Sequence, residues 1–148
     1  MVKFLMVFLM IGATSGYADM NLEAISMIES SNNPKAVNRD EGSYGLFQIS
    51  PIALRDFNQQ VGVKHTVKDL MREETNAHIA IWMLEVRIPQ YIEAYKLPDT
   101  LLIRIAIWNW GISKTTDWYR AGGKFSKLPK QTRRFYEKYK KITGREVL

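Results

Sequence analysis

Apolar residues recur every three or four positions along most of the chain, and glycine and proline divide this pattern into short segments. Spacing of this kind predicts amphipathic helices. Runs in which apolar and polar residues alternate, which half-buried strands require, are scarce. The sequence therefore predicts a mainly α fold with little or no β-structure.

The 148 residues suffice for one compact domain but not for two. Hydrophobic residues make up 46% of the chain, which is enough to build a buried core. No internal repeat, low-complexity tract or Gly/Ser-rich linker interrupts the sequence. We therefore expect a single domain over residues 19–148.

Capping residues and helix breakers predict the boundaries of the helices. Ser50 followed by Pro51 is typical of a helix start, and Gly62 of a helix end. In chain order the expected elements are a helix at 22–29 capped by Asp19 or Asn21, a polar loop at 30–43, a turn or brief strand at 44–49, a helix at 51–62, a short segment from Thr66 to about Met71, an apolar helix beginning at Asn76, a kink or end at Pro89 with a continuation at 91–96, and helices at 101–108, 113–121 and 129–143.

The first eighteen residues have the order of a secretory signal peptide. Lys3 is followed by an uninterrupted apolar run at 4–11 and then by small or polar residues that end at Ala18. Eight apolar residues fall short of the ~20 that a membrane-spanning helix needs. We expect cleavage after Ala18, export to the periplasm or cell wall, and only transient membrane contact through residues 1–18. A start at Met20 would instead give a cytoplasmic form.

The chain carries 21 Lys and Arg against 15 Asp and Glu, a formal net charge of +6. Many of these basic residues lie in the last quarter of the chain, between Lys124 and Lys141. Such a balance suits a polyanion, whether nucleic acid, anionic lipid or an acidic cell-wall polymer, although a charge run is most often a solvated helix face. No nucleic-acid-binding motif is recognisable, so we expect no nucleic-acid partner.

Cysteine is absent, which excludes disulfides, thiolate zinc sites and cysteine nucleophiles. His65 and His78 lack the further histidines or cysteines that a metal site needs. Surface or packing roles are expected for both, and the sequence implies neither a metal nor a cofactor.

Glu29 is the first candidate for chemistry. It follows Ile25 by four residues and Leu22 by seven, so it projects from the apolar side of its helix. A partly desolvated carboxyl has a raised pKa and can act as a general acid near neutral pH. From this local pattern alone, the more common case of a solvated glutamate at a helix end remains open.

Four motifs follow one another along the chain. They are Glu29-Ser30 with Asn33-Pro34 shortly after, the run from Gly45 to Pro51 (Gly-Leu-Phe-Gln-Ile-Ser-Pro), the run from Ala106 to Gly111 (Ala-Ile-Trp-Asn-Trp-Gly), and the run from Pro129 to Arg133 (Pro-Lys-Gln-Thr-Arg). In this order they resemble the lytic transglycosylases of the soluble lytic murein transglycosylase type. The resemblance covers residues 22–139 and implies a lysozyme-like single domain.

The resemblance implies a function for Glu29. It matches the lone catalytic glutamate of the family, which cleaves the bond between N-acetylmuramic acid and N-acetylglucosamine in peptidoglycan and leaves a 1,6-anhydro sugar. The other residues that it places at the substrate are Gln48, Asn109, Gly45, Asn38, Phe47 and Trp108.

These substrate residues have individual expected roles. Gln48 and Asn109 would line the sugar cleft, and Gly45 would let the backbone approach the saccharide. Trp108 stands where the family has tyrosine, and an indole can donate a hydrogen bond but cannot accept one. Asn38 and Phe47 stand where relatives have serine and methionine.

Several further residues have roles that the sequence leaves as expectations. Asn33 should organise the loop after Glu29. Trp108 and Trp110 could stack on sugar rings, whereas Trp82 has the spacing of a core residue. Lys138, Lys140 and Lys141 could attract the acidic stem peptides of peptidoglycan.

Other functions remain open. If Asp40 or Glu41 held a water near Glu29, the enzyme would be a hydrolase, a muramidase similar in fold to goose-type lysozyme. A catalytically silent peptidoglycan-binding or assembly protein is a second alternative, and a basic DNA- or membrane-binding protein a third, which the leader disfavours. The expected partners are peptidoglycan glycan strands, with a secretion, conjugation or phage-entry machine as a further option, and we expect a monomer.

Overall fold

The structure is a computed structural model and describes residues 20–145. In chain order its elements are α1 (Leu22–Ser30), β1 (Val37–Asn38), β2 (Ser43–Tyr44), α2 (Pro51–Val61), the 3-10 helix η1 (Val67–Met71), α3 (Glu73–Trp82), the π turn η2 (Met83–Arg87), α4 (Ile88–Tyr95), α5 (Leu101–Trp110), α6 (Ile112–Arg120), the 3-10 helix η3 (Phe125–Lys127) and α7 (Lys130–Thr143). The prediction of a mainly α fold is confirmed. The predicted signal peptide, residues 1–18, lies outside the described residues.

Local capping explains most helix boundaries. The side chains of Asn21, Ser50 and Thr100 accept hydrogen bonds from the backbone N–H three residues later, at the starts of α1, α2 and α5. Gly62 ends α2 with φ of 77°, a left-handed conformation that glycine adopts without a steric penalty. These starts and this end agree with the predicted ones.

The helix expected to begin at Asn76 begins instead at Glu73. Glu73 and Glu74 occupy its first turn, where negative side chains interact favourably with the helix dipole. Asn76 is fully buried inside α3, and its side chain bonds to backbone groups outside the helix. The polar residue expected to begin this helix therefore has a tertiary role.

Pro89 does not end the helical path. The π turn η2 precedes it and joins α3 to α4. Proline has no N–H to donate, so a carbonyl one turn earlier loses its helical partner. Arg104 donates from Nη1 to Leu84 O at 3.4 Å, while its other nitrogens bind Asp99 in a bidentate ion pair. This buried arginine thus offers a substitute donor to the wide turn.

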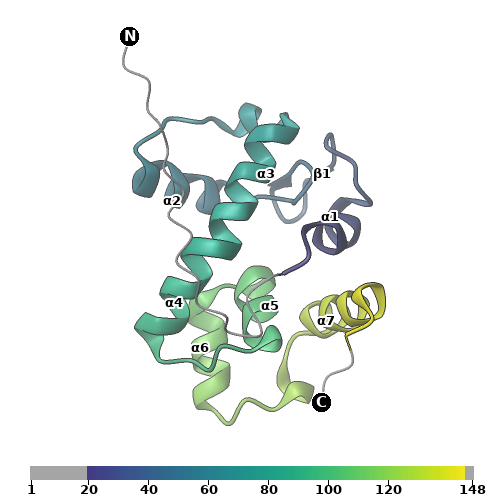
Figure 1. Cartoon of the computed structure of the whole chain (residues 1–148), viewed down its shortest axis with the longest axis vertical. Coiled ribbons are helices and arrows are strands. Elements are labelled where there is room, and N and C mark those ends of the chain that lie inside the picture. The colour runs from purple at the N-terminus through teal and green to yellow at the C-terminus, as the bar shows by residue number, and fades with distance from the viewer. Residues whose placement is uncertain (1–19, 146–148) are drawn as a thin grey trace.

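A short antiparallel hairpin occupies part of the region expected to be a loop. Val37 pairs with Tyr44 and Asn38 with Ser43, and an isolated bridge joins Tyr44 to Ile49. Strands of two residues carry too little alternation to be recognised in the sequence. The hairpin matters because it lies beside the end of α1 (Figure 1).

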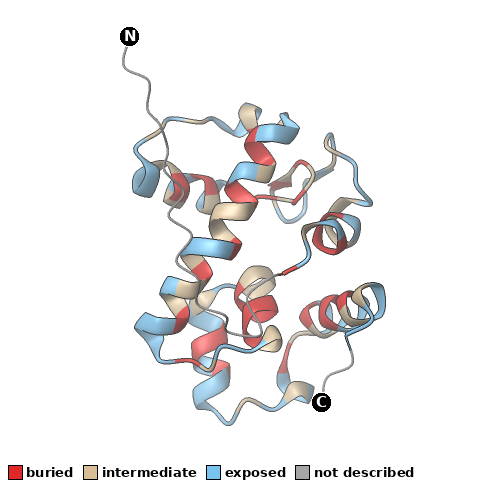
Figure 2. Cartoon of the chain, in the orientation of Figure 1, coloured by how far each residue is buried: buried red, intermediate tan, exposed pale blue. Residues whose placement is uncertain are grey.

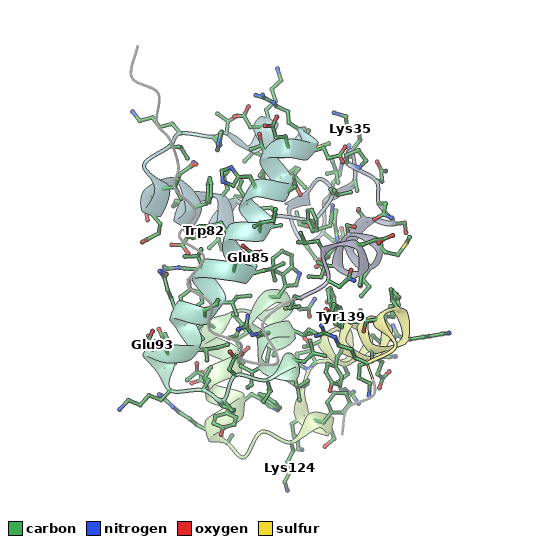
Figure 3. The ribbon with its side chains drawn as sticks, viewed as in Figure 1. Lys35, Trp82, Glu85, Glu93, Lys124 and Tyr139 are labelled. Carbon is green, nitrogen blue, oxygen red and sulfur yellow. The ribbon has the colours of Figure 1, made fainter. Side chains whose placement is uncertain are left out.

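The helices surround one core (Figures 1 and 2). Helices α3 and α4 follow one another along the length of the molecule. Helices α1 and α7 pack against each other on the opposite side of the molecule. Buried residues face inward from every long helix. Tyr139 lies between α7 and α1 (Figure 3) and is fully buried, and its hydroxyl accepts a hydrogen bond from the Asn21 N–H at 2.6 Å. Of the helices in residues 20–145, none has the length and apolar character needed to cross a membrane.

Candidate active site

A groove passes beside the C-terminal end of α1. It consists of two cavities of about 520 and 650 Å³, called here the first arm and the second arm. The two arms meet at residues that line both, namely Glu29, Glu41, Gln48, Asn109 and Gln131. A groove of this size that extends on both sides of a junction fits an elongated ligand better than a small compact one.

The two arms differ in chemistry. The first arm is also lined by basic side chains of α7, Lys130, Arg134 and Lys138. The second arm is lined mainly by apolar and aromatic residues, among them Ile52, Met83, Tyr91, Trp108 and Trp110. Aromatic rings favour contact with flat, weakly polar faces, whereas cations favour acidic groups.

Glu29 lies at the junction of the arms, on the last turn of α1. Burial of its carboxyl raises the pKa from the ordinary value of 4.5 to about 7. A hydrogen bond from Trp108 opposes this shift, and the negative charge of Glu41 adds to it. With a pKa near 7, Glu29 can give and take a proton at neutral pH.

Trp108 determines which oxygen of Glu29 can carry a proton. Its indole Nε1 donates to Glu29 Oε1 at 2.8 Å. Because the indole N–H only donates, and the carbonyl oxygen of a carboxylic acid is a better acceptor than its hydroxyl oxygen, this hydrogen bond favours Oε1 as the unprotonated oxygen. The proton of the neutral acid therefore belongs on Oε2. A tyrosine hydroxyl at this position could also accept and would leave the choice of oxygen open.

Replacement of Trp108 by phenylalanine should raise the pKa of Glu29, because it removes the donor that stabilises the carboxylate and keeps the aromatic bulk. The titration of the Glu29 carboxyl, followed by ¹³C NMR, measures this shift. Trp110→Phe is the matched control, since Trp110 lines the same arm and has no hydrogen bond to Glu29 within residues 20–145. A titration midpoint that stays in place in Trp108→Phe would contradict the assigned hydrogen bond.

Glu41 and Gln131 form a bridge between the hairpin loop and α7. Gln131 Nε2 donates to Glu41 Oε1 at 2.8 Å, and both side chains are exposed. Glu29, Gln48 and Asn109, which line the same junction, are half-buried.

Replacement of Glu41 by glutamine should lower the pKa of Glu29, the opposite of the change expected from Trp108→Phe. Glutamine keeps an acceptor for Gln131 and removes the negative charge that raises this pKa.

Gln48 lies at the junction, as expected, but its amide is largely engaged within its own turn. Nε2 donates to Gly45 O at 2.8 Å and to Ala36 O at 3.3 Å, and Oε1 accepts from Ser43 Oγ at 2.9 Å. Its φ of 51° is unusual for a residue other than glycine. The side chain therefore holds the hairpin and the turn together, and Oε1 keeps one lone pair for a further donor.

Gly45 and Phe47 lie away from the groove, in contrast to the expectation that they contact substrate. Phe47 is only 4% exposed and belongs to the core. Gly45 is buried with φ of 78°, and a Cβ there would overlap Leu70 O and the Asn76 side chain. The glycine is thus required by close packing against η1 and α3, and this packing takes the place of the expected approach to a saccharide.

Asn38 and Asn109 both line the groove. Asn38 Oδ1 accepts from the backbone N–H groups of Asp40 and Glu41, both at 3.2 Å, and thereby sets the loop that presents Glu41. Asn109 Oδ1 accepts from Thr132 Oγ1 at 2.7 Å, which leaves its amide nitrogen for other partners. Asp40 is exposed and lines neither arm.

Hydrogen bonds join the four motifs into one site. Ser30 Oγ donates to Leu46 O at 2.7 Å, linking the first motif to the second. The bond between Trp108 and Glu29 links the third to the first, and the bond between Thr132 and Asn109 links the fourth to the third. The loop residue Asn33 accepts from the Lys35 N–H at 2.9 Å, as expected for a residue that organises this loop.

Two further residues support the site and were not expected to do so: Gln131 lines both arms, whereas Asn76 lines neither arm and holds the turn at 44–47 from within the core. Asn76 Oδ1 accepts from the Phe47 N–H, and its Nδ2 donates to Tyr44 O and Leu70 O, at 2.8 to 2.9 Å. The sequence does not single out either residue for its role, because Phe47 and Tyr44 lie 29 and 32 positions from Asn76, and Glu41 lies 90 positions from Gln131, although Gln131 stands within the fourth motif. The four-residue spacing of Lys130, Arg134 and Lys138 is a signal that the sequence does contain.

No group of three His, Asp or Glu side chains in residues 20–145 could hold a metal ion.

Trp82 packs edge-on against Phe57, with ring centroids 5.3 Å apart, and is partly buried against the core.

Comparison with known protein families gives one match: the model of the transglycosylase SLT domain matches residues 6–130. Searches of curated proteins and of solved structures gave no match. The matched range includes three of the four motifs and reaches into the fourth, so it confirms the resemblance seen in the motifs, and with it the lysozyme-like fold class.

Proposed function

The chain belongs to the transglycosylase SLT domain family, and on this basis we propose that it is a lytic transglycosylase that cleaves the glycan strands of peptidoglycan at Glu29. The observation that carries the proposal is the position and acidity of one carboxyl. Glu29 has a pKa of about 7 and lies where the two arms of the groove meet.

In the first step Glu29 acts as an acid. The proton on Oε2 passes to the glycosidic oxygen between N-acetylmuramic acid and N-acetylglucosamine. As the bond between this oxygen and C1 of N-acetylmuramic acid breaks, the carbonyl oxygen of the same sugar's N-acetyl group attacks C1 and forms an oxazolinium ion. The Trp108 N–H stabilises the carboxylate that Glu29 becomes.

In the second step the Glu29 carboxylate acts as a base. It takes the proton of the C6 hydroxyl, and O6 attacks C1 to form the 1,6-anhydro ring and restore the N-acetyl group. Glu29 ends protonated, as it began, and no water is consumed. A pKa near 7 suits both steps, because neither protonation state is strongly disfavoured at neutral pH.

Hydrolysis is the second candidate activity, and Glu41 is the residue that favours it. Its carboxylate lines both arms together with Glu29 and acts on the Glu29 pKa. A second carboxylate that positions a water is the requirement for a muramidase. Asp40, the other carboxylate of this loop, lines neither arm and is the weaker candidate.

Export follows from the same proposal, since peptidoglycan lies outside the cytoplasmic membrane. The order of residues 1–18 supports cleavage after Ala18 and a periplasmic or cell-wall location. We further propose a monomer that serves a secretion, conjugation or phage-entry machine by opening the wall locally.

The product of the reaction tests the proposal. Purified protein from Asp19 onward is incubated with peptidoglycan sacculi, and the soluble products are analysed by mass spectrometry. Anhydro-muropeptides, which are lighter than the hydrolysed products by one water, are the expected result.

Two other outcomes are informative. Muropeptides with reducing ends would make the protein a muramidase and point to Glu41. If folded protein released no products, a peptidoglycan-binding or assembly role would replace the enzymatic one.

A further inference from the structure

Helix α7 presents three cations to the first arm of the groove. Lys130, Arg134 and Lys138 follow one another at intervals of four residues and all line this arm together with Glu29. Residues four apart lie on the same face of a helix. Lys138 follows Lys130 by eight positions, a rise of about 12 Å along the helix, so the three side chains form a row, called here the cationic row.

The cationic row lacks carboxylate partners in the described part of the chain. The ion pairs of residues 20–145 join Arg72 to Asp69, Arg87 to Asp56 and Arg104 to Asp99, and none involves the row. Within the first arm the carboxyl groups are those of Glu29 and Glu41. Glu29 is largely neutral below pH 7, and Glu41 accepts from Gln131.

Like charges at four-residue spacing repel one another. The same helix could place these charges elsewhere, and other lysines of this region do lie away from the groove. Lys140 Nζ lies 5.2 Å from the centroid of the Tyr136 ring, Lys124 extends away from the molecule (Figure 3), and Lys127 and Lys141 are exposed. Of Lys138, Lys140 and Lys141, which the sequence suggests could attract acidic peptides, only Lys138 lines the groove.

We propose that the cationic row binds the free carboxylates of the peptidoglycan stem peptide, so that the first arm recognises peptide-bearing muramic acid while the second arm receives sugar. This inference rests on the proposed function. The stem peptide is attached to the muramic acid whose glycosidic bond lies at Glu29, so it leaves the glycan close to the junction of the arms. Its carboxylates are the acidic groups nearest the scissile bond.

The chemistry of the row suits carboxylates on a flexible peptide. Arg134 offers a planar fork of N–H donors that can bind a carboxylate through two hydrogen bonds. The flanking lysines are point charges on long stems and can follow a carboxylate whose position varies. The second arm, with Trp108, Trp110 and Tyr91, offers aromatic faces and carries no lysine or arginine.

Binding is tested in the Glu29→Gln background, so that no cleavage is needed. Three ligands are compared: soluble glycan strands with intact stem peptides, the same strands with their carboxylates converted to amides, and strands freed of peptide by an amidase. The Glu29→Gln protein with an unchanged cationic row should bind intact strands about tenfold more tightly than amidated or peptide-free strands. Dissociation constants are measured by calorimetry at low and at moderate salt.

The row variant Lys130→Gln, Arg134→Gln, Lys138→Gln should bind all three ligands alike. A control with the same change in net charge, Lys124→Gln, Lys127→Gln, Lys141→Gln, should keep the preference for intact strands. Equal effects of the two triple variants would reduce the row to general attraction of a polyanion and overturn the proposal. So would an undiminished preference in the row variant.

A phosphate-bearing wall polymer is the other acidic source that this row could meet. Such a polymer, added as a competitor, separates the two sources. If it displaced intact and peptide-free strands to the same extent, the row would be assigned to phosphate. Failure of the proposed cleavage leaves these binding results unaffected. Conversely, release of anhydro-muropeptides with no preference for intact strands would reject this inference alone.

Discussion

Glu29→Gln should abolish strand cleavage and, at pH 8, make the protein more stable than the wild type. The loss of activity is expected to reach about 10³- to 10⁴-fold, because one group supplies both the acid and the base step. The amide keeps the shape of the side chain and can still accept from Trp108. The expected effect is therefore chemical, with little change in structure.

The gain in stability follows from the pKa of Glu29. In the unfolded chain this carboxyl ionises near 4.5, whereas in the folded protein it ionises near 7. The folded state thus holds a proton that the unfolded state has released, and its stability falls as pH rises through this window. The shift corresponds to about 3 kcal/mol, present in full below pH 4.5 and lost above pH 7. A glutamine does not titrate and loses nothing.

Urea unfolding at pH 4.5 and pH 8 measures this difference. Wild type and Glu29→Gln should be nearly equal at the lower pH and separate at the higher one. Glu23→Gln is the matched control, since Glu23 is exposed, belongs to the same helix and lines neither arm. It should keep wild-type activity. Substantial cleavage by Glu29→Gln, or a stability difference that does not change with pH, would remove Glu29 from its assigned role.

Asn76→Ala should destabilise the fold by about 3 to 5 kcal/mol and lower the melting temperature by about 10 °C. Asn76 is fully buried and bonds to three backbone groups, the Phe47 N–H and the carbonyls of Tyr44 and Leu70. Alanine leaves these groups without a partner in a site that its side chain cannot fill. Each unsatisfied buried group costs about 1 to 3 kcal/mol.

Asn58→Ala provides the comparison. Asn58 also makes two hydrogen bonds to a backbone, both with His65, but it is half-buried, so water can replace its side chain. The expected loss is about 1 kcal/mol. Thermal and urea unfolding of both variants, with hydrogen exchange of the Phe47 amide, give the measurement. If the two alanine variants were equally stable, the buried bonds of Asn76 would not hold the turn.

The helices could be predicted wherever a boundary depends on residues within one turn of it. Ser50 with Pro51, Thr100 and Gly62 act through bonds or backbone angles that their immediate neighbours determine. The start of α3 was missed although acidic residues mark its first turn, because the role of Asn76 depends on distant groups, as does the π turn before Pro89. Asn76 serves the turn at 44–47, and Arg104 supplies a donor to the π turn.

The site was predictable in part for the same reason. Glu29, Trp108 and Asn109 stand in motifs that can be recognised from the sequence, and the structure brings them together at the groove. Gly45 and Phe47 belong to such a motif as well, but their contribution is packing. The contact of Gln131 with Glu41 and the orientation of the α7 cations toward the groove depend on the fold, since α7 approaches the hairpin loop only in the folded chain.

The bonds that join the motifs have a consequence for how this sequence can change. A substitution at Thr132 removes the partner of Asn109, and one at Trp108 removes the partner of Glu29. The free-energy cost of altering both members of such a pair therefore differs from the sum of the separate costs. Asn109 and Thr132, which lie 23 residues apart in the chain, are thus expected to vary jointly, whereas Glu29 is held by its chemistry and restricts the choice of side chain at Trp108, 79 residues away.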